Sequence, residues 1–326
     1  MYGSAPKKQQ GVALIVALLV LAIATGLASA MIVRNQNAFN VTAALENGAR
    51  ADALANSAFI LAEAMLDRDD QHIDGPADMW AQPMQDLPID GAMVSLRVVD
   101  MQGRFNINDL ITADDKVNLV AKARFQKLLG ILKINTDISN AVIDWIDANQ
   151  TIEPGGGEDG QYQQRGQNGT PSLPAGRPMI SVTELRGVNG VTESIYQRLA
   201  PFVSALPVGT PINLNSAPPA VLQALGAQVA VNPTAATSSS PPKNIGSVAD
   251  FLAQPEFGGT VVQPDGLSVN SQYFLCAVTI RMDNVTRHRY AMIERSASGS
   301  TSGQTSNTSH LIALSNEACL TGLSCL

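Results

Sequence analysis

The sequence has few of the residues that carry most enzyme chemistry. Among 326 residues there are three cysteines and three histidines, the latter far apart at positions 72, 288 and 310. A G-x-S-x-G motif, a phosphate-binding glycine loop and a convincing nucleophile–base pair are absent. The pair Asp144 and Asp147 would suit a hydrolase, but carboxylates beside a glycine-rich loop more often hold a cation. We therefore predict that the chain is not an enzyme.

Positive charge is also scarce. Lys and Arg number 21 against 28 Asp and Glu, which gives a formal net charge of -7. Because phosphate recognition needs a basic surface, this balance argues against a nucleic-acid-binding protein. Three cysteines are too few for a disulfide scaffold. Hydrophobic residues reach 45% of the chain, which is enough for one or two packed domains beside an apolar segment.

One long uncharged run lies near the amino terminus. No residue from Val12 to Val33 is charged, and Leu, Ile, Val and Ala dominate. A helix of this length spans the roughly 30 Å hydrocarbon layer of a membrane. Lys7 and Lys8 precede the run, so the positive-inside rule places the amino terminus in the cytoplasm and the body outside. In a bacterium with two membranes the body then lies in the periplasm, where a disulfide can persist.

Three interpretations of this run differ in its fate. A secretory signal would be removed, and Ala28-Ser29-Ala30 would be its cleavage site. A plain anchor would simply stay. The third interpretation starts from a short basic leader, KKQQG, that ends at Gly11 directly before the apolar run. Residues 35–70 then continue with apolar residues at helical spacing, as though one helix left the membrane and carried on.

The leader and the apolar run, KKQQG followed by VALIVALLVLAI, resemble the class III signal of pilins and pseudopilins. The resemblance implies that a prepilin peptidase cuts between Gly11 and Val12 and that the apolar helix stays on the mature protein. This family usually has glutamate at the fifth mature position, where the chain has Val16. In the family this glutamate neutralises the terminal amine of the subunit above. The chain resembles one branch that lacks it, the K-type minor pseudopilins of type II secretion, in which no subunit lies above.

Two regions show strand patterns. Apolar and polar residues alternate over 94–98, and the turn that follows predicts a returning strand over 104–107. The preceding residues 71–91 contain three prolines and two glycines and are predicted to be loop. In the second region, residues 273–280 are apolar on both faces, which predicts a strand buried on both sides.

The second strand region continues towards the carboxyl terminus. Asp283-Asn284 predicts a hairpin, after which residues 287–295 return. A linker rich in serine, threonine and glycine follows, and a last edge strand is expected near Leu311. The region therefore predicts an antiparallel sheet.

The stretch between the two strand regions shows helix signals. Caps for helices are predicted at Thr112, Ser181, Thr192, Ser216 and Ser247. A clear apolar stripe over 138–146 predicts a further helix. The pair of helices that starts at Ser181 and Thr192 also matches a helix–hairpin–helix module for DNA, although its flanks lack a lysine-rich face.

This order of elements predicts an α+β fold, in which a long amino-terminal helix packs on a pilin-like antiparallel sheet with a large all-helical insertion. The predicted parts are a leader over 1–11, a transmembrane segment over 12–33, the periplasmic part of the helix over 34–70, a β domain over 71–110 and 268–326, and the inserted helical domain over 111–267. A separate carboxy-terminal β domain is the alternative, but it would leave a lone early hairpin, which is only marginally stable.

The loop that follows residue 146 combines carboxylates, amide oxygens and three glycines. Calcium takes six to eight oxygen ligands from such flexible loops, although the EF-hand pattern is absent. From composition alone, a solvated acidic loop explains the pattern somewhat better. The resemblance reverses that preference, because K-type pseudopilins have a similar D-W-I-D…G-x-E-D-x-x-Y run and bind calcium in this region. The oxygen donors of the loop predict Asp147, Asn149, Glu158 and Asp159 as the ligands, together with backbone carbonyls.

The cysteines allow two interpretations. Cys319 and Cys325 lie close together near the carboxyl terminus, whereas Cys276 lies in an apolar run. If the body is exported, Cys319–Cys325 is the better candidate for a disulfide. Three free thiols are the alternative.

The resemblance also implies a function. The chain would be a minor pseudopilin, inserted once in the inner membrane, that packs against the I- and J-type and also the H-type minor pseudopilins. Together they would form the tip that starts pseudopilus assembly for export of folded proteins. Two other classes remain, a membrane-anchored periplasmic protein for DNA uptake and a tethered hydrolase.

Overall fold

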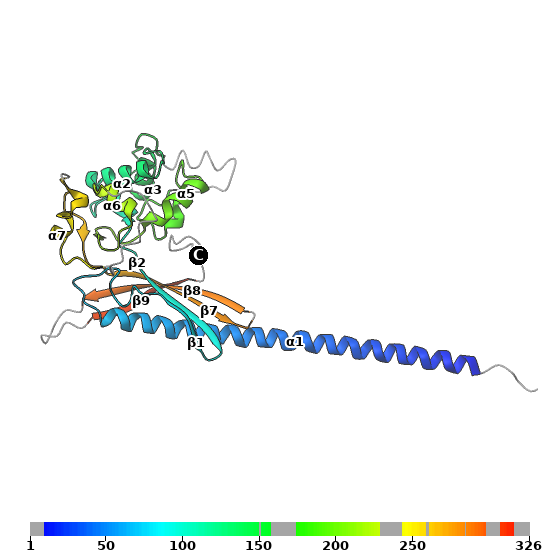
Figure 1. Ribbon diagram of the computed structural model, residues 1–326. Helices are drawn as coiled ribbons and strands as arrows, with labels where there is room; N and C mark the ends of the chain where they lie inside the picture. Colours follow the sequence, from blue (N-terminus) through cyan, green and yellow to red (C-terminus); the bar gives the residue numbers. More distant parts are fainter. Residues whose placement is uncertain are drawn as a thin grey trace, which may run out of the picture.

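A single helix of 58 residues, α1 (Gln10–Asp67), forms the long axis of the computed structural model. Its amino-terminal half extends far beyond the rest of the molecule (Figure 1). Because α1 contains no proline, the apolar run and the body-side half form one uninterrupted helix, as predicted. The structure describes residues 10–149, 151–157, 174–228, 243–258, 261–283, 285–297 and 307–315.

A five-stranded antiparallel sheet packs on the carboxyl-terminal part of α1. Its order is β1-β2-β7-β8-β9, with β1 (Met84–Ile89), β2 (Ala92–Asp100), β7 (Tyr273–Met282), β8 (Val285–Ala297) and β9 (Asn307–Ser315). The helix meets the sheet largely through small residues, Ala51, Ala55, Ala58 and Ala62, with Phe59 and Leu66 between and beyond them. Small side chains let the helix axis lie close to the strands, so the buried apolar residues of both elements form one core.

The predicted loop over 71–91 was wrong in part, because its second half forms β1. Pro88 has no backbone N–H to donate to a neighbouring strand. It is tolerated because β1 is an edge strand. Asp90 and Gly91 form the turn into β2, both with positive φ. The turn residues at 90–91 could have predicted a hairpin here, but the three prolines of this stretch favoured a loop.

The predicted return of residues 104–107 beside β2 was also wrong. Both edges of β2 are occupied, by β1 on one side and β7 on the other, so no place remains for a hairpin partner. Instead β3 (Phe105–Asn106) pairs in parallel with β4 (Val203–Ser204), away from the main sheet. The chain thus leaves the sheet at the end of β2.

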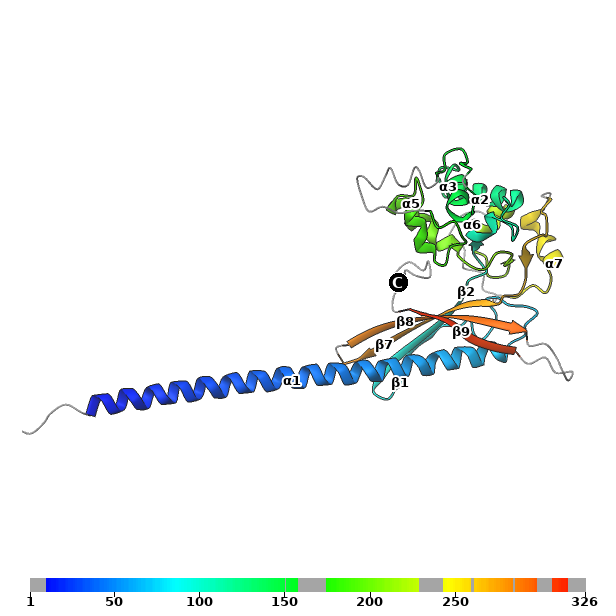
Figure 2. The ribbon, with the colours of Figure 1, turned by 180° about the vertical axis from the view of Figure 1, so that it is seen from behind.

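Strand β7 confirms the prediction of burial on two sides only in part. The face towards α1 is buried at alternate residues from Phe274 to Ile280. The opposite face is buried at Tyr273 and Leu275 but only half-buried at Ala277 and Thr279. The helical region covers one end of this outer face and leaves the other open (Figure 2).

Helical elements fill the sequence between β2 and β7. They are η1 (Ile107–Leu110), α2 (Leu119–Ile131), α3 (Ile138–Ile146), η3 (Val182–Gly187), α5 (Glu193–Leu199), η4 (Ala200–Phe202), α6 (Pro219–Leu225), α7 (Val248–Leu252) and η5 (Pro255–Phe257), with the two-residue strands β5 (Ile212–Asn213) and β6 (Leu267–Ser268). We call this the helical unit. It has its own buried apolar core and lies on the side of the sheet opposite α1 (Figures 1 and 2). The predicted α+β architecture is confirmed, whereas the domain boundaries remain a prediction.

Three of the five predicted caps are confirmed. Ser181 and Glu184 form a capping box at η3, Thr192 caps α5 through the Ile195 N–H, and Ser247 caps α7. In each case a short polar side chain replaces the missing intrahelical acceptor.

The other two predicted caps were wrong. Thr112 opens a turn in which Asp115 has a positive φ, so no helix can continue, and α2 instead begins after Asn118. The helix after Ser216 begins only at Pro219, because a proline disfavours helical backbone in the residue before it.

A buried polar network joins the helical unit to the sheet. The Asp100 carboxylate accepts hydrogen bonds from Asn213 Nδ2 at 2.8 Å and from Ser271 Oγ at 2.7 Å, and burial raises its pKa. Gln102 Nε2 donates to the Pro211 carbonyl at 3.0 Å. These bonds satisfy groups that would otherwise be costly to bury, so they fix how the two parts meet.

Candidate functional site

The amino-terminal half of α1 presents apolar side chains on every face. Within the described part of the chain it is the one helix long and apolar enough to cross a membrane. Its large side chains from Val12 to Leu45 are 52–75% exposed. Gly11 and Val12, the predicted cleavage position, lie in the first turn of this helix. A surface of this kind requires lipid or other helices around it.

Alongside the sheet, α1 has a second exposed apolar strip. Phe59 and Ala62 face the sheet, whereas the neighbouring Ile60 and Leu61 are 64% and 44% exposed. The helix is therefore covered on one side only. Its free side carries these two apolar residues beside exposed polar ones such as Asn56 and Ser57.

The acidic loop after α3 is organised around Asp144. This carboxylate is fully buried and accepts backbone hydrogen bonds from Glu153 N at 3.1 Å and from Gly157 N at 2.8 Å. Gly156 passes so close that a Cβ there would overlap Asp144 Oδ2. The glycines of this loop thus allow the backbone to wrap around the carboxylate.

Asp147, a predicted calcium ligand, lies at the end of α3 with the predicted ligand Asn149 beside it. Asp147 Oδ2 accepts a 2.8 Å hydrogen bond from Asn149 Nδ2, but its Oδ1 is buried with no hydrogen-bond partner. Burial, together with the charges of Asp144 and Asp115, raises the pKa of Asp147 to about 6. Burial likewise raises the pKa of Asp144 to about 6. Lys122 partly offsets the shift at Asp144, whereas the charges that act on Asp147 are those of other carboxylates.

Three residues of this region were not among the predicted ligands. Asp115, far away along the chain, accepts a 3.1 Å hydrogen bond from Ala148 N. Glu153 pairs with Lys122 at 3.3 Å, and the Oδ1 of Asn140 is buried without a partner. Of the predicted ligands, Asp147 and Asn149 are therefore brought together, and Glu158 and Asp159 lie outside the described residues.

A different group of carboxylates lies at the end of α1. Asp69, Asp74 and Asp78 have oxygens within 4.8 Å of one another, a spacing that could bind a metal. Asp74 is fully buried and ion-paired with the buried Arg295. Burial raises the pKa of Asp74 to about 7, although the Arg295 guanidinium opposes that shift. The guanidinium already supplies a cation to this cluster, which the sequence did not predict.

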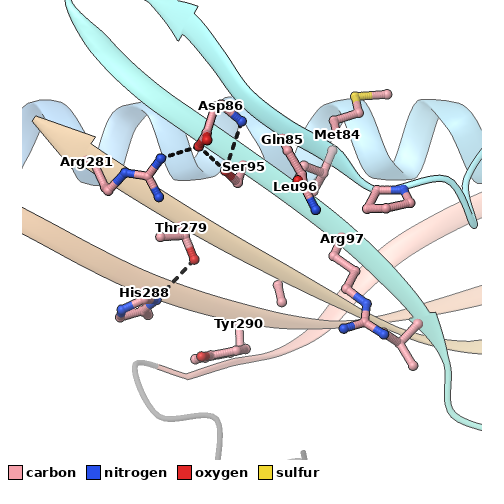
Figure 3. A pocket seen from close by; sticks show the side chains of 13 residues that line it. Met84, Gln85, Asp86, Ser95, Leu96, Arg97, Thr279, Arg281, His288 and Tyr290 are labelled. Carbon is pink, nitrogen blue, oxygen red and sulfur yellow. Dashed lines mark hydrogen bonds and ion pairs between the residues drawn. The ribbon is translucent and has the colours of Figure 1, made fainter. Parts of the chain in front are cut away.

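The open end of the sheet's outer face forms a groove of about 320 Å³ with a mixed polar and apolar lining (Figure 3). Arg281 is ion-paired with Asp86, which also accepts a 3.1 Å hydrogen bond from Ser95 Oγ. Across the groove, Thr279 Oγ1 and His288 Nδ1 are hydrogen-bonded at 3.0 Å. These groups largely satisfy one another, and the groove contains none of the predicted site residues.

The described part of the chain leaves the disulfide prediction open. Cys319 and Cys325 lie outside the described residues. Cys276 is buried and unpaired, and burial raises the pKa of its thiol to about 12. Its role is packing in the core between α1 and the sheet.

Comparison with known proteins decides what these features belong to. The profile of a family described as type II secretion system (T2SS), protein K, matches residues 103–208. A type II secretion system protein K from Pseudomonas aeruginosa is 35% identical over 232 residues, which cover 67% of this chain and 68% of the relative. The chain belongs to the type II secretion system protein K family. Another protein K, from Klebsiella pneumoniae, is 29% identical and covers 88% of this chain and 93% of its own length.

The fold agrees with this family. In the crystal structure of the GspK-GspI-GspJ complex from enterotoxigenic Escherichia coli, one chain matches with a TM-score of 0.69 at 23% identity, covering 85% of this chain and 99% of that one. Proteins K are minor pseudopilins, structural proteins rather than enzymes, so the prediction that the chain is not an enzyme is confirmed. Membership of the protein K family also argues against the two alternative functions, DNA uptake and hydrolysis by a membrane-tethered enzyme.

Proposed function

We propose that this minor pseudopilin is inserted once in the inner membrane through residues 12–33 and holds its body in the periplasm. A prepilin peptidase removes residues 1–11, and the mature chain then packs against the I-, J- and H-type minor pseudopilins. The solved complex supports the choice of partners, because the matching protein there is assembled with GspI and GspJ. The assembly forms the tip of the pseudopilus and starts its growth.

One observation carries this proposal: α1 is a continuous helix with apolar residues that no described part of the molecule covers. Its membrane half is exposed all round, and its body half exposes Ile60 and Leu61 opposite the sheet. In a membrane the first half is covered by lipid, and the second is available to the helices of other subunits. A simple stalk would need no apolar surface outside the membrane.

The position of the helical unit supports a place at the tip. It lies over the body, at the opposite end of the molecule from the start of α1 (Figure 2). A subunit added above would have to occupy the same space. The absence of a glutamate at Val16 fits this position, because no terminal amine from a higher subunit has to be neutralised.

The test is intact mass and amino-terminal sequencing of the protein extracted from membranes in which the I- and J-type pseudopilins are also produced. We expect a chain that starts at Val12, keeps its apolar helix and co-purifies with both partners. The same spectrum shows whether the new amino terminus is methylated and whether the mass is two units low for a Cys319–Cys325 disulfide. A chain that starts at Met1, or after Ala30, would contradict the proposal.

We also propose that calcium binds at Asp147 and Asn149, with Glu158 and Asp159 completing the set. The residues present fit a hard cation, because Asp147 Oδ1 is a buried oxygen without a hydrogen-bond donor. Bound calcium would supply the positive charge that this end of α3 lacks, and would hold the glycine-rich loop closed.

A calcium titration of the full-length protein, followed by thermal unfolding after chelation of any carried-over metal, tests this site. We expect the unfolding temperature to rise with calcium at submillimolar to millimolar concentration. No rise at millimolar calcium would contradict the proposal. The Asp69, Asp74 and Asp78 group serves as the internal comparison: Asp78→Asn should leave the calcium response unchanged.

A further inference from the structure

An apolar pocket of about 510 Å³ lies where the helical unit meets the outer face of the sheet. The helical unit contributes Ile180 and Leu206, β8 contributes Met292, and β9 contributes its last residues, 312–315. The floor of the pocket continues a small buried cluster that includes Leu206 and Leu275. The pocket is therefore the solvent-exposed edge of the apolar contact between the helical unit and the sheet.

The rim is unusually apolar for a water-exposed surface. Ile180, Leu314 and Ile312 are 77%, 63% and 46% exposed, and all three line the pocket. Single exposed apolar residues are ordinary, but a group around one pocket indicates a surface that something covers.

The chain itself supplies a segment of suitable chemistry. Eleven residues, 316–326, follow β9 directly after Ser315, which lines the pocket. Their sequence, NEACLTGLSCL, holds three leucines and a single charged side chain, Glu317. Fully extended they reach at most about 40 Å. A tether that starts in the pocket wall gives this segment an effective concentration in the millimolar range, which a separate protein rarely reaches.

We propose that residues 316–326 pack into this pocket through Leu320 and Leu323. The carboxyl-terminal segment thereby covers Ile180 and Leu314 and closes the seam between the helical unit and the sheet. This inference is independent of the proposed function, because it needs neither the membrane nor partner subunits.

Thiol cross-linking in the full-length protein tests the position of this segment. Cys325→Ser leaves Cys319 as the one thiol of the segment, and Ile180→Cys places a second thiol at the rim of the pocket. Cys276 does not compete because it is buried. After reduction, diamide should oxidise Cys319 and the introduced thiol to a disulfide within one chain, detected by mass spectrometry of a non-reduced digest.

The matched control is Leu119→Cys in the same background. Leu119 is as exposed as Ile180, at 75%, but it is the first residue of α2. Figure 1 shows α2 away from β9. We expect an intrachain yield about tenfold higher at position 180 than at 119, since effective concentration sets the rate. Equal yields at both positions would overturn the proposal. A disulfide formed only between two chains would overturn it in favour of a partner as occupant.

A second pair of variants asks whether the leucines hold the segment. In the cross-linking background, Leu323→Asp should lower the yield at position 180 several-fold, because a carboxylate resists transfer into an apolar pocket. Ser324→Asp adds the same charge at a polar neighbour and should leave the yield nearly unchanged. Equal effects of both substitutions would contradict packing through the leucines.

Discussion

At the scale of single residues, the informative groups are carboxylates that the fold buries. Asp147 and Asp74 are both buried with raised pKa values, yet their surroundings differ. Asp74 faces the Arg295 guanidinium, whereas Asp147 faces other carboxylates. The first arrangement already contains its counter-ion, although Asp74 Oδ1 has no hydrogen-bond partner, and the second calls for a cation from solution.

Asp147→Asn should raise the unfolding temperature of the calcium-free protein at pH 7.5 and abolish its response to calcium. A carboxyl whose pKa is raised to about 6 in the folded state binds protons more tightly there than in the unfolded state, so its destabilising effect is present at neutral pH. That effect fades as the pH falls through 6 towards the ordinary value of 3.8. The gap between variant and parent should therefore narrow by pH 5.

Thermal unfolding at the two pH values, with and without calcium, measures this. The control is Asp114→Asn, which removes an exposed carboxylate from the turn between Thr112 and Lys116. This variant should keep the calcium response. If Asp147→Asn responds to calcium like the parent protein, the ligand assignment is wrong.

Arg295→Met should lower the free energy of unfolding by about 3–5 kcal/mol, because it leaves Asp74 buried without a counter-charge. Arg295 is 3% exposed and Asp74 is fully buried, so solvent cannot compensate. Adding Asp74→Asn to this variant should recover most of the loss. Chemical denaturation of the full-length protein in detergent measures both.

The control for this pair is Arg281→Gln, which breaks the exposed ion pair with Asp86. An exposed pair contributes less than about 1 kcal/mol, so this change should be small. A similar loss for both arginine variants would mean that burial does not determine the effect.

At the scale of elements, the connection from β2 into the helical unit depends on close backbone approach. At Gly103 a Cβ would overlap the carbonyl of Ser216, so the two backbones pass with no room for a side chain. Gly130, within α2, has nothing near its Cβ position. A side chain is therefore excluded at Gly103, whereas there is room for one at Gly130.

Gly103→Ala should destabilise the protein by about 2 kcal/mol, since one of the two backbones must move. Gly130→Ala should stabilise it by about 0.5–1 kcal/mol, because alanine favours the helix and meets no obstacle. Unfolding temperatures of the two variants, compared with the parent, give the sign of each effect. Destabilisation by Gly130→Ala would indicate a constraint on α2 beyond those described.

At the scale of the whole molecule, one side of α1 holds the sheet and the other remains for partners. Ile60→Asp should reduce co-purification with the I- and J-type pseudopilins several-fold while leaving the unfolding temperature unchanged. Ile60 is 64% exposed, so its replacement removes little packing within the body.

Met93→Asp is the matched control for this experiment, because Met93 is an exposed apolar residue on β2, at 45% exposure. It should leave co-purification intact. If the two variants lose partners equally, the free side of α1 is not the interface.

The sequence alone determined the membrane helix, its continuation into the body, the strands β2, β7, β8 and β9, and the helical character of the stretch between them. These features depend on local periodicity and turn residues, which a single segment carries in full. The sequence also determined that Asp147 and Asn149 lie beside a glycine-rich loop, because all of them are close along the chain.

Only the tertiary structure decided which strands pair and which distant groups meet. Residues 104–107 could not return beside β2 because β7, from the far end of the chain, takes that edge. Asp115 reaches the loop after α3, and Arg295 reaches Asp74, across sequence separations that leave no local pattern. Which strands pair depends on competition for the same sheet edge, and which buried carboxylates find a partner depends on groups brought in from distant parts of the chain. No single stretch of sequence contains that information.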